Sequence, residues 1–250
     1  LLMLEEIAWA RDVLVRYDHL VGAEARLNTV NHPAIATISS GCSKPRQRFS
    51  IAHELGHYEL HKIYANGFFC NDIGKYQWWE KQTAKDKKKL REFEANQFAA
   101  NFLLPASLFV NQCDCHTPDF NVISSLAKLF QTSLTATALR YIDFCLEPVV
   151  LVFCQNNWIR WFKESTSFEE IRDELGFFIG IHSKVNANTL TGRFFSSGRK
   201  PIGKQQVLAS DWFISNRRLY PKAKIQEQTV CMPQYNSTLS LLLINEEIGE

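Results

Sequence analysis

Hydrophobic residues in the first half of the chain recur mainly at the spacing of amphipathic helices. Between residues 1 and 20, apolar and charged positions alternate so that the apolar ones share a broad face, which predicts an opening helix. The apolar run over residues 34–39 predicts a short strand. Helical spacing returns over residues 48–63 and again over residues 85–104, where Pro105 closes the second predicted helix.

The second half of the chain has a different pattern. Residues 120–144 carry apolar stripes for two or three short helices, in the proportions of a helix-turn-helix. Short β-prone runs follow, separated by turns that contain Asn and Gly. These predicted strands cover residues 149–154, 158–162, 177–181, 229–232 and 239–244. A chain of 250 residues exceeds the usual size of one domain, so we place a domain boundary near Pro148.

Composition narrows the class of protein. Charged residues make up 22% of the chain and leave a formal net charge of +2, which is too balanced for an overall nucleic-acid or membrane surface. The seven cysteines are an odd number without the regular spacing of a disulfide scaffold, which indicates a reducing compartment. The sequence supports neither a membrane span nor a secretory signal. We therefore expect a cytoplasmic protein.

The strongest chemical signal is the sequence HELGH at residues 53–57, an HExxH motif inside a predicted helix. Residues four apart lie one above the other on a helix, so His53 and His57 can bind one tetrahedral ion. Glu54 is offset toward the coordination position left for water, where a carboxylate can act as general base. The motif predicts a zinc metallopeptidase centre, with Mn²⁺ or another divalent ion as the alternative.

The second predicted helix supplies candidates for a third protein ligand. An apolar stripe along it consists of Leu90, Glu94, Phe98 and Phe102. A carboxylate buried in such a stripe needs a partner, because the desolvation of an unpaired charge is costly. The first helix already implies a metal ion, so Glu94 is the predicted third ligand. A buried pair between Glu94 and a lysine is the alternative.

Two nearby residues, Glu92 and His61, fit the role of third ligand less well. Glu92 follows Lys88 by four residues, so we interpret it as half of a solvated ion pair. His61 lies one turn beyond His57 and about 12 Å along the helix axis from His53, too far to share its ion. We expect His61 in an outer or structural role.

Two segments carry a wider resemblance. They are RFSIAHELGHYELH at residues 48–61 and EFEANQFAANFLLP at residues 92–105. Together they look like the signature pair of the ImmA/IrrE family of regulatory metallopeptidases. The resemblance is specific over about residues 46–106 and looser through the helical stretch that follows.

The resemblance has consequences for the site and for the function. It implies zinc ligands at His53, His57 and Glu94, and a general base at Glu54. It also implies a bacterial, intracellular endopeptidase that cuts a helix-turn-helix transcriptional repressor. Such a cut would derepress a stress-response or mobile-element gene set.

The expected fold is α+β in three parts. Residues 1–115 are expected to form a mainly helical, zincin-like metallopeptidase domain with a small sheet, and residues 116–147 a helix-turn-helix-like segment. For residues 148–250 the resemblance implies a GAF-like α/β sensor domain. A Trp- and Lys-rich insert of about residues 64–88 separates the two signature segments, and we expect it to alter substrate access or cover the site.

Two other functions stay open. A DNA-binding regulator with a non-catalytic peptidase fold would use residues 120–144, but Lys128 and Arg140 are the only basic residues there, too few for a phosphate-neutralising surface. A silent sensor would bind a small signal ligand through residues 148–250. The presence of Glu54 argues against an inactive sensor, because a metal site kept only for stability does not need this residue. We expect a protein substrate, with a ligand of the C-terminal domain as a second partner.

Overall fold

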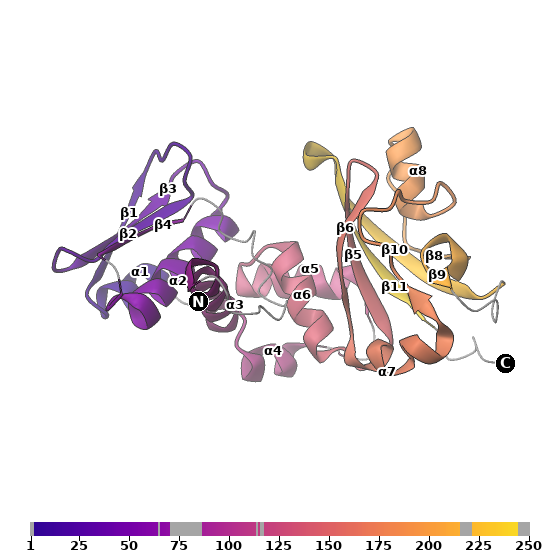
Figure 1. Ribbon diagram of the computed structural model, residues 1–250, viewed down its shortest axis with the longest axis horizontal. Coiled ribbons are helices and arrows are strands. Elements are labelled where there is room, and N and C mark those ends of the chain that lie inside the picture. Colours follow the sequence, from indigo (N-terminus) through magenta and orange to yellow (C-terminus); the bar gives the residue numbers. More distant parts are fainter. Residues whose placement is uncertain are drawn as a thin grey trace. The chain divides into compact units, whose positions relative to one another are not determined.

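The structure, a computed structural model, describes residues 3–64, 66–70, 87–113, 115, 118–215 and 222–244 (Figure 1). It is a mixed α+β protein with eight α-helices among these residues. The chain divides into two compact units, each with its own sheet. The first comprises Leu1–Phe109 and Ala127–Ser133, and the second comprises Val110–Leu126 and Leu134–Glu250. No helix in the described part of the chain has the length and apolar character to cross a membrane.

The sheet of the N-terminal unit has four strands in the order β1-β3-β2-β4. They are β1 (Val13–Asp18), β2 (Ala25–Asn28), β3 (Ala34–Ser39) and β4 (Gly67–Cys70). Strand β1 runs parallel to β3, whereas β2 is antiparallel to both β3 and β4. The strand predicted over residues 34–39 is confirmed as β3. Strand β4 lies at the edge of the sheet and pairs its last residue, Cys70, with Ala25.

The opening helix is shorter than the sequence pattern predicted. Helix α1 spans Leu4–Trp9, and β1 begins at Val13, so the prediction was wrong for the residues of this strand. Asp12 has a φ of 59°, in the left-handed region, which breaks the helical path between the two elements. Val13 and Val15 are β-branched and lie two apart, which suits a strand as well as it suits one face of a helix.

Two long helices follow the sheet of this unit: α2 packs on β2 and β3, and α3 packs on α2. Helix α2 (Lys44–His61) begins earlier than predicted, with Pro45 in its first turn, where a missing N–H is not needed. Helix α3 (Lys87–Leu103) ends before Pro105, as predicted. The two helices approach closely at Gly56, where a Cβ atom would lie 3.1 Å from the Cα of Ala95. A larger residue at this position would push the two helices apart by a few tenths of an ångström.

The helices predicted over residues 120–144 are confirmed. They are α5 (Phe120–Phe130) and α6 (Leu134–Phe144), and the short helix α4 (Ala106–Gln112) precedes them. Helix α6 packs on strands of the C-terminal unit. The three-part division of the chain at residues 115 and 147 stays a prediction.

The C-terminal unit is built on a five-stranded antiparallel sheet in the order β6-β5-β11-β10-β8 (Figure 1). The strands are β5 (Val149–Gln155), β6 (Trp158–Glu164), β8 (Lys204–Leu208), β10 (Lys224–Met232) and β11 (Ser237–Leu243). Four predicted strands are thereby confirmed. The predicted run at 177–181 forms only β7 (Phe177–Phe178), which pairs with β9 (Ile214–Ser215). Strands β5 and β11 are buried along most of their length, which explains the apolar sequence of β5 and the run of three leucines that ends β11.

Two helices of the C-terminal unit were not predicted, α7 (Thr166–Leu175) and α8 (Leu190–Ser197). Both begin with a capping hydroxyl and end at a glycine in the left-handed conformation. Helix α8 packs on β10, where Glu227 is 0% exposed. The carboxylate accepts five hydrogen bonds, from the amides of Leu190 and Thr191, the hydroxyls of Thr191 and Thr229, and the indole of Trp212.

Candidate metal centre

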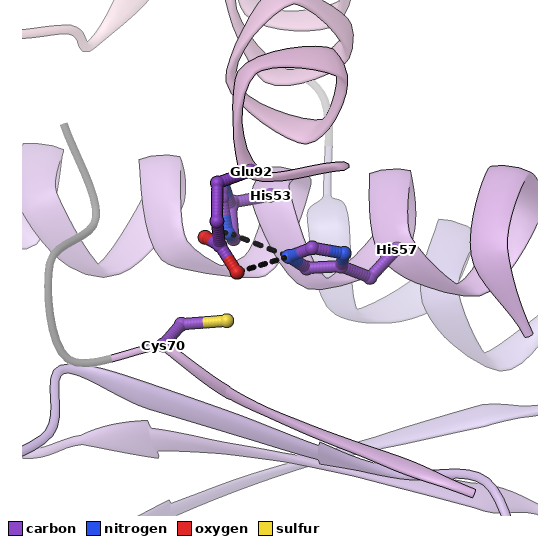
Figure 2. A group of neighbouring side chains, drawn as sticks. All are labelled: His53, His57, Cys70 and Glu92. Carbon is purple, nitrogen blue, oxygen red and sulfur yellow. Dashed lines mark hydrogen bonds and ion pairs between the residues drawn. The ribbon is translucent and has the colours of Figure 1, made fainter. Parts of the chain in front are cut away.

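Helix α2 supplies two imidazoles to one point of the N-terminal unit. His53 and His57 lie one helical turn apart, and both are 0% exposed. Their Nε2 atoms are 3.0 Å apart (Figure 2). The HExxH motif therefore forms the histidine pair that its spacing predicts.

Helix α3 adds a carboxylate to this pair. The oxygens of Glu92 lie 3.3 Å from Nε2 of His53 and 3.5 Å from Nε2 of His57 (Figure 2). Burial raises the pKa of Glu92, but the hydrogen bonds and charges of the two histidines outweigh burial and hold the pKa at about 2. Glu92 is thus an anion that faces both rings.

These distances fit a metal ion. A tetrahedral ion with bonds of about 2.0 Å to nitrogen and oxygen keeps its ligand atoms about 3.3 Å apart. The contacts among His53, His57 and Glu92 agree with this spacing. Together with Cys70, their ligand atoms all lie within 4.8 Å of one another. The residues present can therefore hold a divalent ion.

Outer hydrogen bonds fix the orientation of both rings. Nδ1 of His53 lies 3.0 Å from Oδ1 of Asn96, an acceptor, so this nitrogen carries the proton and Nε2 keeps its lone pair. Nδ1 of His57 lies 3.0 Å from Nδ1 of His61, whose Nε2 donates to Glu94 over 2.9 Å. Burial lowers the pKa of both His57 and His61, although Glu92 opposes this at His57 and Glu94 opposes it at His61.

Glu94 does not lie where the sequence analysis placed it. Its carboxylate contacts His61 rather than the histidine pair, and its side chain is 42% exposed. Residues two apart on a helix point about 200° from each other, so Glu92 and Glu94 face different sides of α3. The carboxylate at the pair is Glu92, which the sequence analysis had interpreted as part of a surface ion pair.

The prediction of Glu94 rather than Glu92 has a physical cause. The stripe that contains Glu94 carries large apolar side chains, but the face of α3 that packs on α2 carries small ones. That buried face consists of Glu92, Ala95, Asn96, Ala99, Ala100 and Leu103. These positions follow the spacing i, i+3, i+4, i+7, i+8 and i+11, the signal that identifies Glu92. The small residues are needed because α2 approaches closely at Gly56.

Glu54 differs from every other charged group of the centre. It is 0% exposed, and among the described residues neither of its carboxylate oxygens has a hydrogen-bond partner. Burial raises the pKa of Glu54 to about 8; the Cys70 thiol opposes this and the charge of Glu92 adds to it. A carboxylate whose pKa lies near neutrality can both accept and release a proton in that range.

Part of the predicted insert belongs to the centre. Residues 66–70 of the insert are described, and they include β4 with Cys70 at its end. The sequence analysis placed these residues in the insert and missed both the strand and Cys70. Residues 71–86 of the insert lie outside the described residues.

The family profile of the IrrE N-terminal-like domain, Peptidase M78, matches residues 10–141, more than half of the chain. The chain belongs to this family. The resemblance to ImmA/IrrE proteins is thereby confirmed. Membership in the IrrE-like family suggests a metallopeptidase-like protein, and His53, His57 and Glu92 form its possible metal site.

Solved structures extend the comparison beyond the family domain. A Mycobacterium tuberculosis transcriptional regulator is similar with a TM-score of 0.59 and 15% sequence identity. The match covers 96% of this IrrE-like chain and 69% of the mycobacterial one. At this identity the likeness shows a shared fold only. A comparison with curated proteins found no significant match.

Proposed function

We propose that this chain is a zinc metalloendopeptidase that cleaves a helix-turn-helix transcriptional repressor and thereby derepresses a stress-response or mobile-element gene set. The observation that carries the proposal is the arrangement of Glu54 beside the three convergent ligand groups. His53, His57 and Glu92 offer lone pairs at tetrahedral spacing, and Glu54 offers two buried oxygens without partners. An unpaired buried carboxylate is costly to keep, so a functional role accounts for it best.

The residues divide the work of peptide hydrolysis among them. A zinc ion, when bound, would polarise the peptide carbonyl and lower the pKa of a water molecule. Glu54 would accept the proton of the attacking water on a carboxylate oxygen and pass it to the nitrogen of the leaving amine. The burial of Glu54 keeps bulk water away from the transferred proton. Burial also raises the pKa of Glu54 to about 8, a value that suits both uptake and release of the proton. Asn96 would hold the ring of His53, and the pair of His61 and Glu94 would hold the ring of His57.

DNA binding by the helical segment is not favoured. Lys128 and Arg140 are the basic residues of α5 and α6. Arg140 is 8% exposed, and its guanidinium lies 3.6 Å from the carboxylate of Asp143. A buried and paired arginine does not neutralise phosphates, so the segment offers little electrostatic attraction to a duplex.

The C-terminal unit is proposed to be a GAF-like sensor domain with a small-molecule ligand. Its five-stranded antiparallel sheet with α7 and α8 supports this. A hollow of about 450 Å³ is lined in part by Arg193, Arg199 and Lys200, which suits an anionic ligand. Thermal-shift screening with anionic metabolites tests the proposal: a hit that Arg193→Ala leaves unchanged would reject this hollow as the site.

We also propose that the protein acts in the cytoplasm. All seven cysteines are free. Free thiols persist where the compartment is reducing, which supports this location. Fractionation of the native cells, with the chain followed by antibody, tests it; recovery outside the cytoplasmic fraction would reject it.

A cleavage assay tests the proposed function. The zinc-loaded protein is incubated with a panel of purified helix-turn-helix repressors from the same organism, and the products are identified by mass spectrometry. We expect one cut in one repressor, and a loss of about 10²–10⁴-fold in rate for Glu54→Gln with zinc retained. Exposed Glu170→Gln is the matched control and should cut at the wild-type rate. Cleavage by Glu54→Gln at the wild-type rate would reject Glu54 as general base, and no cleavage of any repressor would reject the repressor as substrate.

A further inference from the structure

We infer that Cys70 is a fourth protein ligand of the metal and that its sulfur holds the centre in a closed, latent state. This inference rests on the proposed function for its consequence, but the ligand set itself is testable without any substrate. A metallopeptidase needs three protein ligands and one open position. Here a thiol lies beside the other three groups.

The sulfur lies within reach of the same ion. Sγ of Cys70 and the ligand atoms of His53, His57 and Glu92 are all within 4.8 Å of one another. Tetrahedral bonds of about 2.3 Å to sulfur and 2.0 Å to nitrogen place these atoms about 3.5 Å apart, so a shift of at most about 1.3 Å completes the set. Figure 2 shows the sulfur directed toward the other side chains from the side of the sheet.

Strand β4 is fixed in this position by contacts other than the thiol. The ring of Phe68 stacks on the ring of His57, with centroids 4.4 Å apart and planes at 14°. Cys70 follows two residues later and therefore points to the same face of the strand. The backbone of Cys70 also pairs with Ala25 of β2 and accepts from the amide of Glu24. The approach of the sulfur is thus built into the fold.

The burial of the cluster agrees with a closed set. Cys70 is 1% exposed, and the two histidines and Glu54 are 0% exposed. Burial and the charges of Glu54 and Glu92 raise the pKa of the thiol, so without a cation the sulfur stays protonated. A dication among these groups reverses that balance, and the thiol proton leaves to solvent as the sulfur binds.

A sulfur ligand would alter what Glu54 can do. With four protein ligands in place, no coordination position is left for the water that Glu54 serves. The carboxylate of Glu54 lies near the same thiol. Release of the sulfur would open the coordination position next to Glu54. The resting centre would be inactive until Cys70 is displaced.

Cobalt substitution tests the ligand set directly. The full chain is stripped of metal, loaded with one equivalent of Co²⁺ and examined by absorption spectroscopy. We expect a near-ultraviolet thiolate-to-cobalt charge-transfer band in the wild type, lost in Cys70→Ser and kept in the control Cys42→Ser. Wild-type protein without this band overturns the inference, and because this result needs no variant, a misfolded substitution leaves the test intact.

Zinc affinity and probe access provide a second measurement. By chelator competition, Cys70→Ser should bind zinc at least about 100-fold more weakly than wild type, since even outer contacts are worth 10–100-fold. Acetohydroxamate, which needs an open coordination position, should perturb the cobalt spectrum of Cys70→Ser at lower concentration than that of the wild type. Equal response of both proteins overturns the closed state.

The two proposals fail in different ways. A sulfur band with no cleavage of any repressor by wild type or by Cys70→Ser rejects the proposed function and keeps the ligand. Cleavage by the wild type without a sulfur band rejects the ligand and keeps the function. If both proposals hold, Cys70→Ser cleaves faster than the wild type.

Discussion

Among the described residues, each unit contains one glutamate that is 0% exposed, Glu54 in the N-terminal unit and Glu227 in the C-terminal unit. Glu227 accepts five hydrogen bonds from backbone and side-chain donors around the start of α8. Glu54 accepts none from the described residues. The same side chain, buried to the same extent, is therefore a structural anchor in one unit and a carboxyl group without hydrogen-bond partners in the other.

The difference separates stability from function. A buried carboxylate whose oxygens accept a full set of hydrogen bonds holds together the elements that carry the donors and the acceptor, here α8 and β10. A buried carboxylate without donors destabilises the fold and persists only where another role requires it. Replacement of each glutamate by glutamine should therefore change the free energy of unfolding in opposite directions.

The largest effect on stability is expected for Glu227→Gln. The amide of glutamine replaces one acceptor oxygen by an NH₂ group, which is a donor. At least two donors that bonded to that oxygen then lose their acceptor and face another donor. At about 1–3 kcal/mol for each, the free energy of unfolding should fall by about 3 kcal/mol, as measured by urea denaturation. Exposed Glu170→Gln is the control and should stay within about 0.5 kcal/mol of wild type. A change for Glu227→Gln as small as that of the control would show that the five hydrogen bonds are not stabilising.

Glu54→Gln should instead stabilise the metal-stripped protein, and only at higher pH. The folded-state pKa of about 8 lies above the ordinary value of 4.5, so the unfolded chain ionises first. Wild-type stability relative to Glu54→Gln should be unchanged below pH 4.5, fall between pH 4.5 and 8, and level off above pH 8. The gain of the variant at pH 9 should be about 2 kcal/mol or more. Unfolding curves at pH 5 and pH 9 that give the same difference between the two proteins would contradict this account.

A smaller effect, on zinc affinity, is expected for Asn96, a neutral side chain that orients the ring of His53. Asn96→Ala removes the acceptor of His53 Nδ1, so the ring loses its fixed tautomer and orientation. Zinc affinity should fall about 10–100-fold by chelator competition, with the histidines themselves intact. Asn96→Asp, which keeps an acceptor at the same place, should restore most of the loss. Failure of the Asp variant to restore binding would assign Asn96 to packing between α2 and α3.

The sequence predicted the parts of this centre that local geometry determines. His53 and His57 follow from spacing along one helix, and neither depends on a distant element. The choice between Glu92 and Glu94 depends on which face of α3 packs on α2, which Gly56 decides through a tertiary contact. Cys70 comes from a four-residue strand whose position is set by pairing with β2, a signal too short to identify in the sequence.

In the fold too, features set by local sequence pattern were predicted and features set by tertiary contacts were not. The long helices and the apolar runs of β5 and β11 were predicted because their patterns are complete within one segment. Glu227 was missed because β10 begins with a polar run, KIQEQ at residues 224–228, whose burial depends on partners in α8 and on Trp212. Both buried glutamates are therefore products of tertiary context, and only Glu54 was found, because a motif marks it.

The smallest effect is expected for Glu94→Gln, the variant that separates the two acidic residues of α3. Glu94 reaches the centre only through His61 and is 42% exposed, so water can replace much of what its carboxylate provides. Zinc affinity should fall less than about tenfold, because His57 keeps its partner His61. The matched variant Glu92→Gln removes a group in contact with both histidines and should weaken zinc binding at least about 100-fold. The reverse order of the two losses would return Glu94 to the ligand set and would mean that α3 turns when the metal binds.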